Sequence, residues 1–268
     1  MSSVSSINLN KATVWNSHTG GIVYDAELLS KHQLAPTHSL FTPEFWRVRH
    51  SASAQTGGRG QVHFINEGDC HWVLRHYRRG GLIGKLVTDQ YLWLGQNNTR
   101  AFREWHLLAQ LHAQHLPVPV PVAAGYQRRG LLYQADLITV AIPQARTLAQ
   151  RLATDSLDAC IWQQLGRVLA RFHVAGVQHA DLNAHNIVFA EDHSIHVLDF
   201  DRGRIREVNK RWIDVVMQRL LRSLEKLQQQ RKIRFEMSEW SVLVEAHNAA
   251  LLTAIRSGSN PDSPCSSP

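Results

Sequence analysis

Two polar segments in the second half of the chain constrain its fold more than any other feature. They are HADLNAHN at residues 179–186 and VLDFD at residues 197–201. Two short β-prone runs follow the first segment and lead into the second: IVF at residues 187–189 and IHVL at residues 195–198, separated by the turn-forming residues 190–194. If these runs form a hairpin, Asn186 and Asp199 lie close together and Asp181 lies on the loop that precedes them.

The residue types in these segments suit phosphoryl transfer. That reaction needs a carboxylate that accepts the proton of a hydroxyl group, and oxygen ligands that hold Mg²⁺ on the nucleotide phosphates. Asp181, Asn186 and Asp199 supply these groups at intervals of five and thirteen residues. Asp and Asn also populate ordinary turns, so each residue alone has a simpler explanation. The three together, each beside an apolar run, favour a phosphotransferase site.

The pattern HxDLxxxN followed by DFx resembles the catalytic pattern of the protein-kinase-like phosphotransferases. The longer segments HADLNAHNIV, VLDFDRGR, VLRHYRRGGLIGKL and AFREWHLL resemble the 3-deoxy-D-manno-octulosonic acid (Kdo) kinases, a group of lipopolysaccharide-core kinases. This resemblance extends over roughly residues 36–256 and implies an α+β, bilobal, protein-kinase-like fold. It also implies an enzyme that uses ATP and Mg²⁺ and transfers the γ-phosphate to a hydroxyl group, O-4, of Kdo in Kdo-lipid A.

The same resemblance implies roles for individual residues. Asp181 is the expected catalytic base, and Asn186 and Asp199 are the expected Mg²⁺ ligands. The resemblance implies a glycine-rich loop that covers the nucleotide phosphates, because absent side chains let backbone N–H groups approach oxygen; taken alone, these glycines fit an ordinary hairpin turn better. Its residues are Gly57, Gly58 and Gly60.

A buried ion pair is the next expected feature. Glu104 shares a helix face with Leu108 and Leu111, so its carboxylate should point inward and needs a cationic partner; the alternative is an ordinary exposed glutamate. In the resembled family that partner is a lysine, but here the position falls at Arg75, whose planar fork is not equivalent to an ammonium group. Lys85 is the nearest lysine, and the sequence leaves open which of the two serves the phosphates.

Three departures from the general kinase pattern bear on regulation and substrate. Ala180 replaces the usual arginine before the catalytic Asp, which argues against control by a phosphorylated loop. Asp201 replaces the usual glycine after DF and is a further metal ligand, a second carboxylate of the site or, the simplest explanation, a polar turn residue. No APE motif follows, and helical patterning resumes by about Arg211, so the short segment between suits a small or lipid-linked acceptor better than a polypeptide.

Hydrophobic periodicity and turn residues divide the 268 residues into four parts. These are a weakly ordered lead-in (1–35), a strand-rich lobe (36–142), a helical lobe (143–256) and a disordered tail (257–268). Expected strands are Gly57–Ile65, Cys70–Tyr77 and 131–142, and expected helices span about 99–115, 157–172, 212–230 and 239–255.

The charge balance favours an anionic partner. Lys and Arg number 29 against 22 Asp and Glu, a net charge of +7. One basic cluster holds Arg75, Arg78, Arg79 and Lys85, and a second holds Arg202, Arg204, Arg206, Lys210 and Arg211. The second cluster is open to three explanations: it binds substrate, it docks on an anionic bilayer, or it is a solvated surface. No helix-turn-helix or RNA-binding aromatic motif accompanies the charge, so a nucleic-acid partner is not expected.

The sequence features below make the cytoplasm the default location, and the resemblance implies the cytoplasmic face of a bacterial inner membrane, with peripheral contact. The three cysteines form no CxxC pair, the first residues lack a secretory signal pattern, and no apolar run approaches the ~20 residues of a spanning helix. Two alternatives remain open: a heptose or other small-molecule kinase of the same fold, and a nucleotide-binding pseudokinase scaffold. Only Arg75 favours the pseudokinase, and the intact set of Asp181, Asn186 and Asp199 opposes it.

Overall fold

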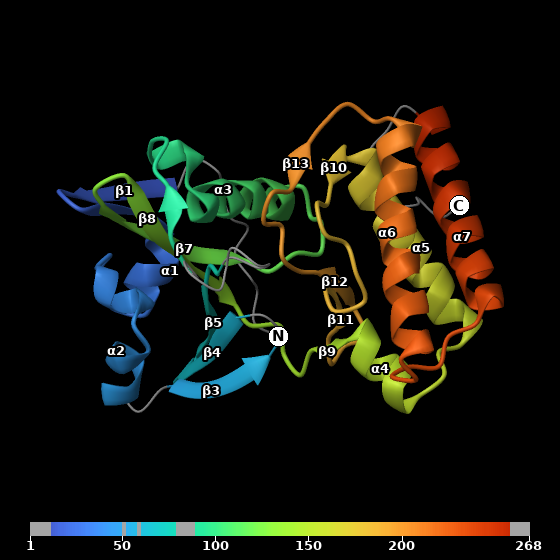
Figure 1. Cartoon of the computed structure of the whole chain (residues 1–268), viewed down its shortest axis with the longest axis horizontal. Coiled ribbons are helices and arrows are strands. Elements are labelled where there is room, and N and C mark those ends of the chain that lie inside the picture. Colours follow the sequence, from blue (N-terminus) through green and yellow to red (C-terminus); the bar gives the residue numbers. More distant parts are fainter. Residues whose placement is uncertain (1–11, 50–51, 58–59, 79–88, 258–268) are drawn as a thin grey trace, which may run out of the picture. The chain divides into compact units, whose positions relative to one another are not determined.

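The computed structural model of the chain describes residues 12–49, 52–57, 60–78 and 89–257. The chain forms two compact units, Met1–Ile142 and Pro143–Pro268 (Figure 1). An antiparallel sheet dominates the first unit, and helices dominate the second. The α+β, two-lobed organisation expected from the sequence is therefore confirmed.

The sheet of the first unit has the strand order β1-β2-β7-β8-β5-β4-β3, with β6 paired to β8 beside this path. Its strands are β1 Ala12–Ser17, β2 Gly20–Asp25, β3 Ala52–Gly57, β4 Gly60–Glu67, β5 Cys70–His76, β6 Tyr91–Leu92, β7 Pro121–Arg129 and β8 Leu132–Val140. The helical segments of this unit are α1 Ala26–Lys31, η2 His38–Phe41, α2 Pro43–Val48, η4 Gln96–Asn98 and α3 Arg100–Ala113.

Different helices pack against the two faces of this sheet. Neighbouring residues on β5 point to opposite faces because side chains alternate along a strand. Leu74 packs in one hydrophobic cluster with Leu40 and Trp46, so η2 and α2 cover its face. Arg75 contacts Glu104 of α3, which places α3 on the other face. The Arg75 side chain therefore lies on the face of the sheet that α3 covers.

Helix α3 forms where its periodic pattern predicts. Phe102, Trp105, Leu108 and Leu111 are all buried, since a 3.6-residue period places them on one face. Thr99 is the N-cap residue, although its hydroxyl donates to the carbonyl of Gln96 instead of capping the helix.

Two expectations for the first unit are wrong. Residues 1–35 are expected to be weakly ordered, yet β1, β2 and α1 lie within them, because β2 pairs with the distant β7. A single strand is expected from Gly57 to Ile65, whereas β3 ends at Gly57 and β4 begins at Gly60, which is paired with it.

The second unit is built on helices. They are α4 Leu148–Thr154, α5 Ala159–Val174, α6 Lys210–Gln229 and α7 Met237–Ser257. Helices α5 and α7 pack so closely at Gly166 that a Cβ atom there would lie 2.3 Å from the carbonyl oxygen of Leu243. Two small sheets complete the unit: β10 Val177–Gln178 with β13 Arg204–Ile205, and β9 Arg146–Thr147 with β11 Ile187–Phe189 and β12 Ile195–Val197.

Candidate active site

The hairpin of β11 and β12 forms as the sequence predicts. Ile187 pairs with Val197, and the backbone N–H of Leu198 donates to the carbonyl oxygen of Asn186 at 2.8 Å. Asn186 therefore lies directly before β11. Asp199 directly follows Leu198, the residue whose backbone N–H binds the Asn186 carbonyl oxygen. The two expected metal ligands are brought together by local strand pairing alone.

His179 holds the preceding loop against the hairpin. Its Nε2 donates to the carbonyl oxygen of Leu198 at 2.9 Å, and its Nδ1 accepts the backbone N–H of Asp181 at 3.1 Å. Burial lowers the pKa of His179 below its usual value, which favours the neutral ring that this pair of bonds requires. The ring also packs edge-on against Phe200, with centroids 4.8 Å apart.

Two side-chain amides fix the backbone at Asp181. The Nδ2 groups of Asn183 and Asn186 each donate to the carbonyl oxygen of Asp181 at 2.9 Å. The Asp181 side chain itself is 64% exposed, and its Oδ1 lies 3.5 Å from Nη1 of Arg219. The loop is thus rigid in its backbone while its carboxylate stays accessible to a substrate.

The donor set at Asn186 and Asp199 fits Mg²⁺. Because Asn186 uses its Nδ2 to bind the loop, its side-chain oxygen is the atom left to act as a ligand. Asp199 has a φ of 62° and adds a carboxylate at the end of the hairpin. Among the residues that the structure describes, no group of three or more His, Cys, Asp or Glu could hold a metal. Mg²⁺ commonly takes one or two protein ligands, with water and phosphate oxygens completing the shell.

Asp201 lies in the turn that follows Asp199 and is half-buried. The turn leads into β13, and polar residues such as Asp are common in turns. Its possible role as a further ligand stays a prediction.

The expected ion pair is present in the first unit. Nη2 of Arg75 lies 2.5 Å from Oε2 of Glu104, whose side chain is only 2% exposed. The hydroxyl of Tyr77 donates to the same oxygen at 2.5 Å, and its ring lies 4.8 Å from the Arg75 guanidinium carbon. Glu104 therefore binds two donors from β5 and the residue that follows it.

Tyr77 also joins a wider group of arginine and tyrosine side chains. The guanidinium carbon of Arg100 lies 5.4 Å from the Tyr77 ring and 4.6 Å from the Tyr91 ring. The backbone N–H of Arg100 donates to the Tyr133 hydroxyl at 3.0 Å. These contacts fix the start of α3 and hence the position of Glu104.

The sequence reasoning missed two residues at these sites. A signal for Tyr77 existed, because residues two apart on a strand share a face and Tyr77 follows Arg75 at that spacing. No pattern pointed to Arg219, which lies 38 residues from Asp181.

The remaining expected site residues are described only in part. Gly57 ends β3 and Gly60 begins β4, and the two residues pair with each other. Gly58 and Lys85 lie outside the described residues. The glycine-loop role and the choice between Arg75 and Lys85 stay predictions.

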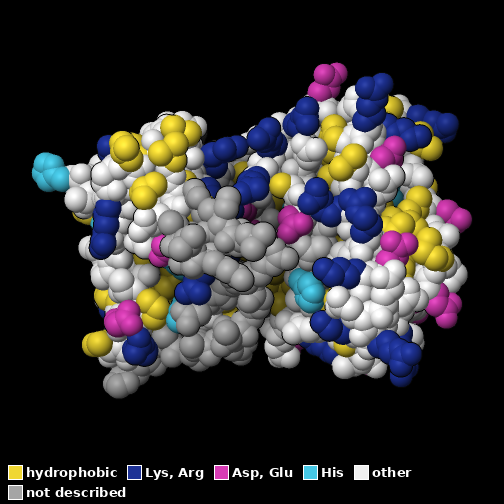
Figure 2. Space-filling view, in the orientation of Figure 1, with side chains coloured by type: hydrophobic (Ala, Val, Ile, Leu, Met, Phe, Trp, Pro, Cys, Tyr) yellow, Lys and Arg dark blue, Asp and Glu magenta, His cyan; other side chains and the backbone are white. Residues whose placement is uncertain are grey.

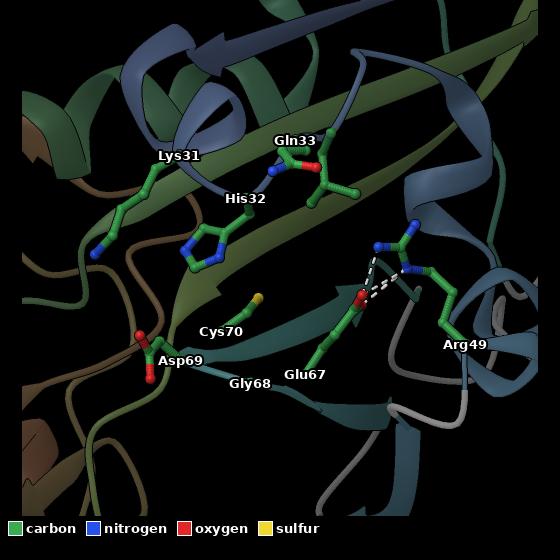
Figure 3. A pocket seen from close by; sticks show the side chains of 9 residues that line it. Lys31, His32, Gln33, Arg49, Glu67, Gly68, Asp69 and Cys70 are labelled. Carbon is green, nitrogen blue, oxygen red and sulfur yellow. Dashed lines mark hydrogen bonds and ion pairs between the residues drawn. The ribbon is translucent and has the colours of Figure 1, made fainter.

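A polar pocket in the first unit contains none of the expected site residues (Figure 3). It is lined by Lys31, His32, Gln33, Leu34, Arg49, Glu67, Gly68, Asp69 and Cys70. Arg49 and Glu67 neutralise each other across it, with Nε of Arg49 at 2.8 and 2.9 Å from the two carboxylate oxygens. Burial raises the pKa of the Cys70 thiol to about 12, so this cysteine is not a nucleophile.

Comparison with known proteins agrees with these observations. A family model described as lipopolysaccharide kinase (Kdo/WaaP) family matches residues 43–247. Three relatives are each named 3-deoxy-D-manno-octulosonic acid kinase. The relative from Stenotrophomonas maltophilia is 41% identical over 86% of this chain and 90% of its own length. The relative from Vibrio parahaemolyticus is 38% identical over 84% and 92%, and that from Xanthomonas campestris is 42% identical over 78% and 81%.

These matches cover both units and include the loop and hairpin that carry Asp181, Asn186 and Asp199. The bilobal fold is therefore protein-kinase-like and the chain is a phosphotransferase, for which ATP is the implied phosphate donor. The chain belongs to the lipopolysaccharide kinase (Kdo/WaaP) family.

Proposed function

We propose that this kinase transfers the γ-phosphate of ATP to a hydroxyl group, O-4, of Kdo in Kdo-lipid A. The observation that carries the proposal is the hairpin of β11 and β12, which brings Asn186 and Asp199 together beside the loop of Asp181. The names of the relatives from three genera support Kdo as the acceptor sugar.

The residues divide the reaction between them. Asp181 orients the accepting hydroxyl and takes its proton. Asn186 and Asp199 hold Mg²⁺, which when bound neutralises charge on the β- and γ-phosphates. Arg75 binds nucleotide phosphate oxygens, and Glu104 and Tyr77 hold its guanidinium in place. The glycine run adds backbone N–H groups, with Lys85 as a further cation for the phosphates.

We also propose peripheral contact with an anionic inner-membrane surface. No helix in the described part of the chain is both long and apolar enough to span a bilayer. The segment 202–211 is exposed except at the half-buried Gly203, and contains Arg202, Arg204, Arg206, Lys210 and Arg211. Basic groups near an anionic surface contribute about 1 kcal/mol each. Figure 2 shows Lys and Arg side chains spread over the visible face of the second unit, with acidic groups among them.

The test is transfer of labelled phosphate from γ-labelled ATP with Mg²⁺ to three acceptors. They are Kdo-lipid A, a heptose-bearing core and lipid A without Kdo. We expect label on Kdo-lipid A alone, and NMR of the product should place the phosphate at O-4.

Other outcomes would revise particular parts of the proposal. Label on the heptose core alone would keep the fold and the catalytic residues but discard Kdo as the acceptor. Absence of label on all three, with ATP still bound, would favour a pseudokinase scaffold. The membrane contact is tested separately, by binding of the protein to anionic and to neutral lipid vesicles. Equal binding to both would rule out a membrane role for residues 202–211.

A further inference from the structure

Arg219 lies beside the expected catalytic carboxylate and belongs to none of the groups assigned above. Its Nη1 is 3.5 Å from Oδ1 of Asp181, and its side chain is 42% exposed. Nδ2 of Asn183 lies 3.5 Å from the other carboxylate oxygen. Each oxygen of Asp181 therefore faces one donor at long range, and Arg219 is the only cation among the described residues that forms an ion pair with it.

A rigid element presents Arg219 to the loop. Helix α6 is anchored by a buried stripe that includes Val216 and Leu220, which flank Arg219 in the sequence. One turn further along, Oγ of Ser223 accepts the backbone N–H of Ala184 at 3.2 Å. Residues four apart lie on the same helix face, so Arg219 and Ser223 both face the catalytic loop.

The geometry of Arg219 differs from that of an arginine committed to a protein carboxylate. In the same chain Arg49 binds both carboxylate oxygens of Glu67, and its Nε lies 2.8 Å from Oε1 and 2.9 Å from Oε2 (Figure 3). Arg219 makes one contact at 3.5 Å and no other hydrogen bond or ion pair with a described residue. Most of its N–H donors therefore stay accessible next to Asp181.

We propose that Arg219 binds the carboxylate of the acceptor sugar, so that the enzyme selects a sugar acid and holds it at Asp181. A guanidinium fork matches a carboxylate through two parallel hydrogen bonds, which gives direction as well as affinity. The inference rests on the proposed function, because Kdo is an octulosonic acid and carries the required carboxylate on the sugar that accepts phosphate. Arg219 is then a residue that determines acceptor specificity.

The experiment compares two acceptors and three forms of the full-length protein. The acceptors are Kdo-lipid A with its Kdo carboxyl free, and the same molecule as the carboxyl methyl ester. The proteins are wild type, Arg219→Gln and Lys226→Gln. Lys226 is the matched control because it removes the same charge from an exposed position two turns further along α6, about 10 Å away.

We expect Arg219→Gln to lower kcat/KM for the free acid by about 10- to 100-fold, mostly through KM for the acceptor. On the methyl ester, Arg219→Gln and wild type should differ by less than about threefold, because the ester offers no charge for Arg219 to bind. Lys226→Gln should behave as wild type on both acceptors, and thermal unfolding should show that all three proteins are folded.

Two results would overturn this inference alone. Equal losses on the acid and the ester would mean that Arg219 acts on Asp181 or on the transferred phosphoryl group. An unchanged kcat/KM for the free acid would mean that it has no part in acceptor binding. If wild type labels neither acceptor, the proposed function itself fails, so the two failures are distinguishable.

Discussion

Removing one hydroxyl group, in Tyr77→Phe, tests how the Arg75–Glu104 ion pair is held. The Tyr77 hydroxyl donates to Oε2 of Glu104 at 2.5 Å, and the Glu104 side chain is 2% exposed, so water cannot replace this donor. Hydrogen bonds to charged groups contribute about 1.5–3 kcal/mol. Phenylalanine keeps the ring beneath the Arg75 guanidinium, so the packing change is small.

We therefore expect Tyr77→Phe to lower the free energy of unfolding of the first unit by about 1.5–3 kcal/mol. A loss of this size lowers Tm by roughly 3–12 °C. Because Glu104 then holds Arg75 less firmly, KM for ATP should rise more than KM for the acceptor. Urea unfolding followed by circular dichroism gives the stability, and initial rates at varied ATP give the kinetic change.

Tyr24→Phe is the matched control. Tyr24 is half-buried on β2, and its hydroxyl forms no hydrogen bond with a described residue. Its loss should cost less than about 0.5 kcal/mol. If Tyr77→Phe were as stable as Tyr24→Phe and kept the wild-type KM for ATP, Tyr77 would have no part in positioning the pair.

Three further predictions concern the second unit. His173 and His247 are hydrogen-bonded to each other at 2.8 Å, and burial lowers both pKa values, that of His173 to about 3. Below pH 6.5 the unfolded chain binds protons that the folded chain cannot, so acid should remove stability by about 1.4 kcal/mol per pH unit from His173 alone, and His247 should act in the same direction; denaturant midpoints that stay constant from pH 7 to 5 would contradict this. Gly166→Ala should lower the free energy of unfolding by about 3 kcal/mol, because its Cβ would lie 2.3 Å from the Leu243 carbonyl oxygen, and an unchanged Tm would refute the close approach of α5 and α7. Asn186→Ala should raise the Mg²⁺ concentration that gives half-maximal transfer, and an unaltered Mg²⁺ dependence would remove Asn186 from the metal site.

Local patterns predicted the parts of the site that are local in the chain. The hairpin after Asn186 needs only two short β-prone runs and a turn, and helix α3 needs only its 3.6-residue period. The inward direction of Glu104 followed from the same period, and its cationic partner followed from the cost of burying a carboxylate alone.

Non-local contacts account for what the sequence did not reveal. Strand β2 has little amphipathic pattern, and its partner β7 lies about 100 residues away in the chain. Strand β7 begins at Pro121, and a proline does not by itself indicate the start of a strand. Arg219 reaches Asp181 only because α6 packs against the catalytic loop, and nothing in the α6 sequence marks that arginine among its neighbours.

The most direct measurement of the central claim separates ATP binding from phosphate transfer in Asp181→Asn. The Asp181 side chain is 64% exposed, so the substitution should leave the fold intact. We predict that transfer to Kdo-lipid A falls by roughly 10²- to 10⁴-fold, while Kd for ATP with Mg²⁺, measured by calorimetry, changes less than about threefold because the expected metal ligands Asn186 and Asp199 remain. Transfer within tenfold of wild type, with ATP still bound, would contradict the account, because Asp181 would then not be the catalytic base.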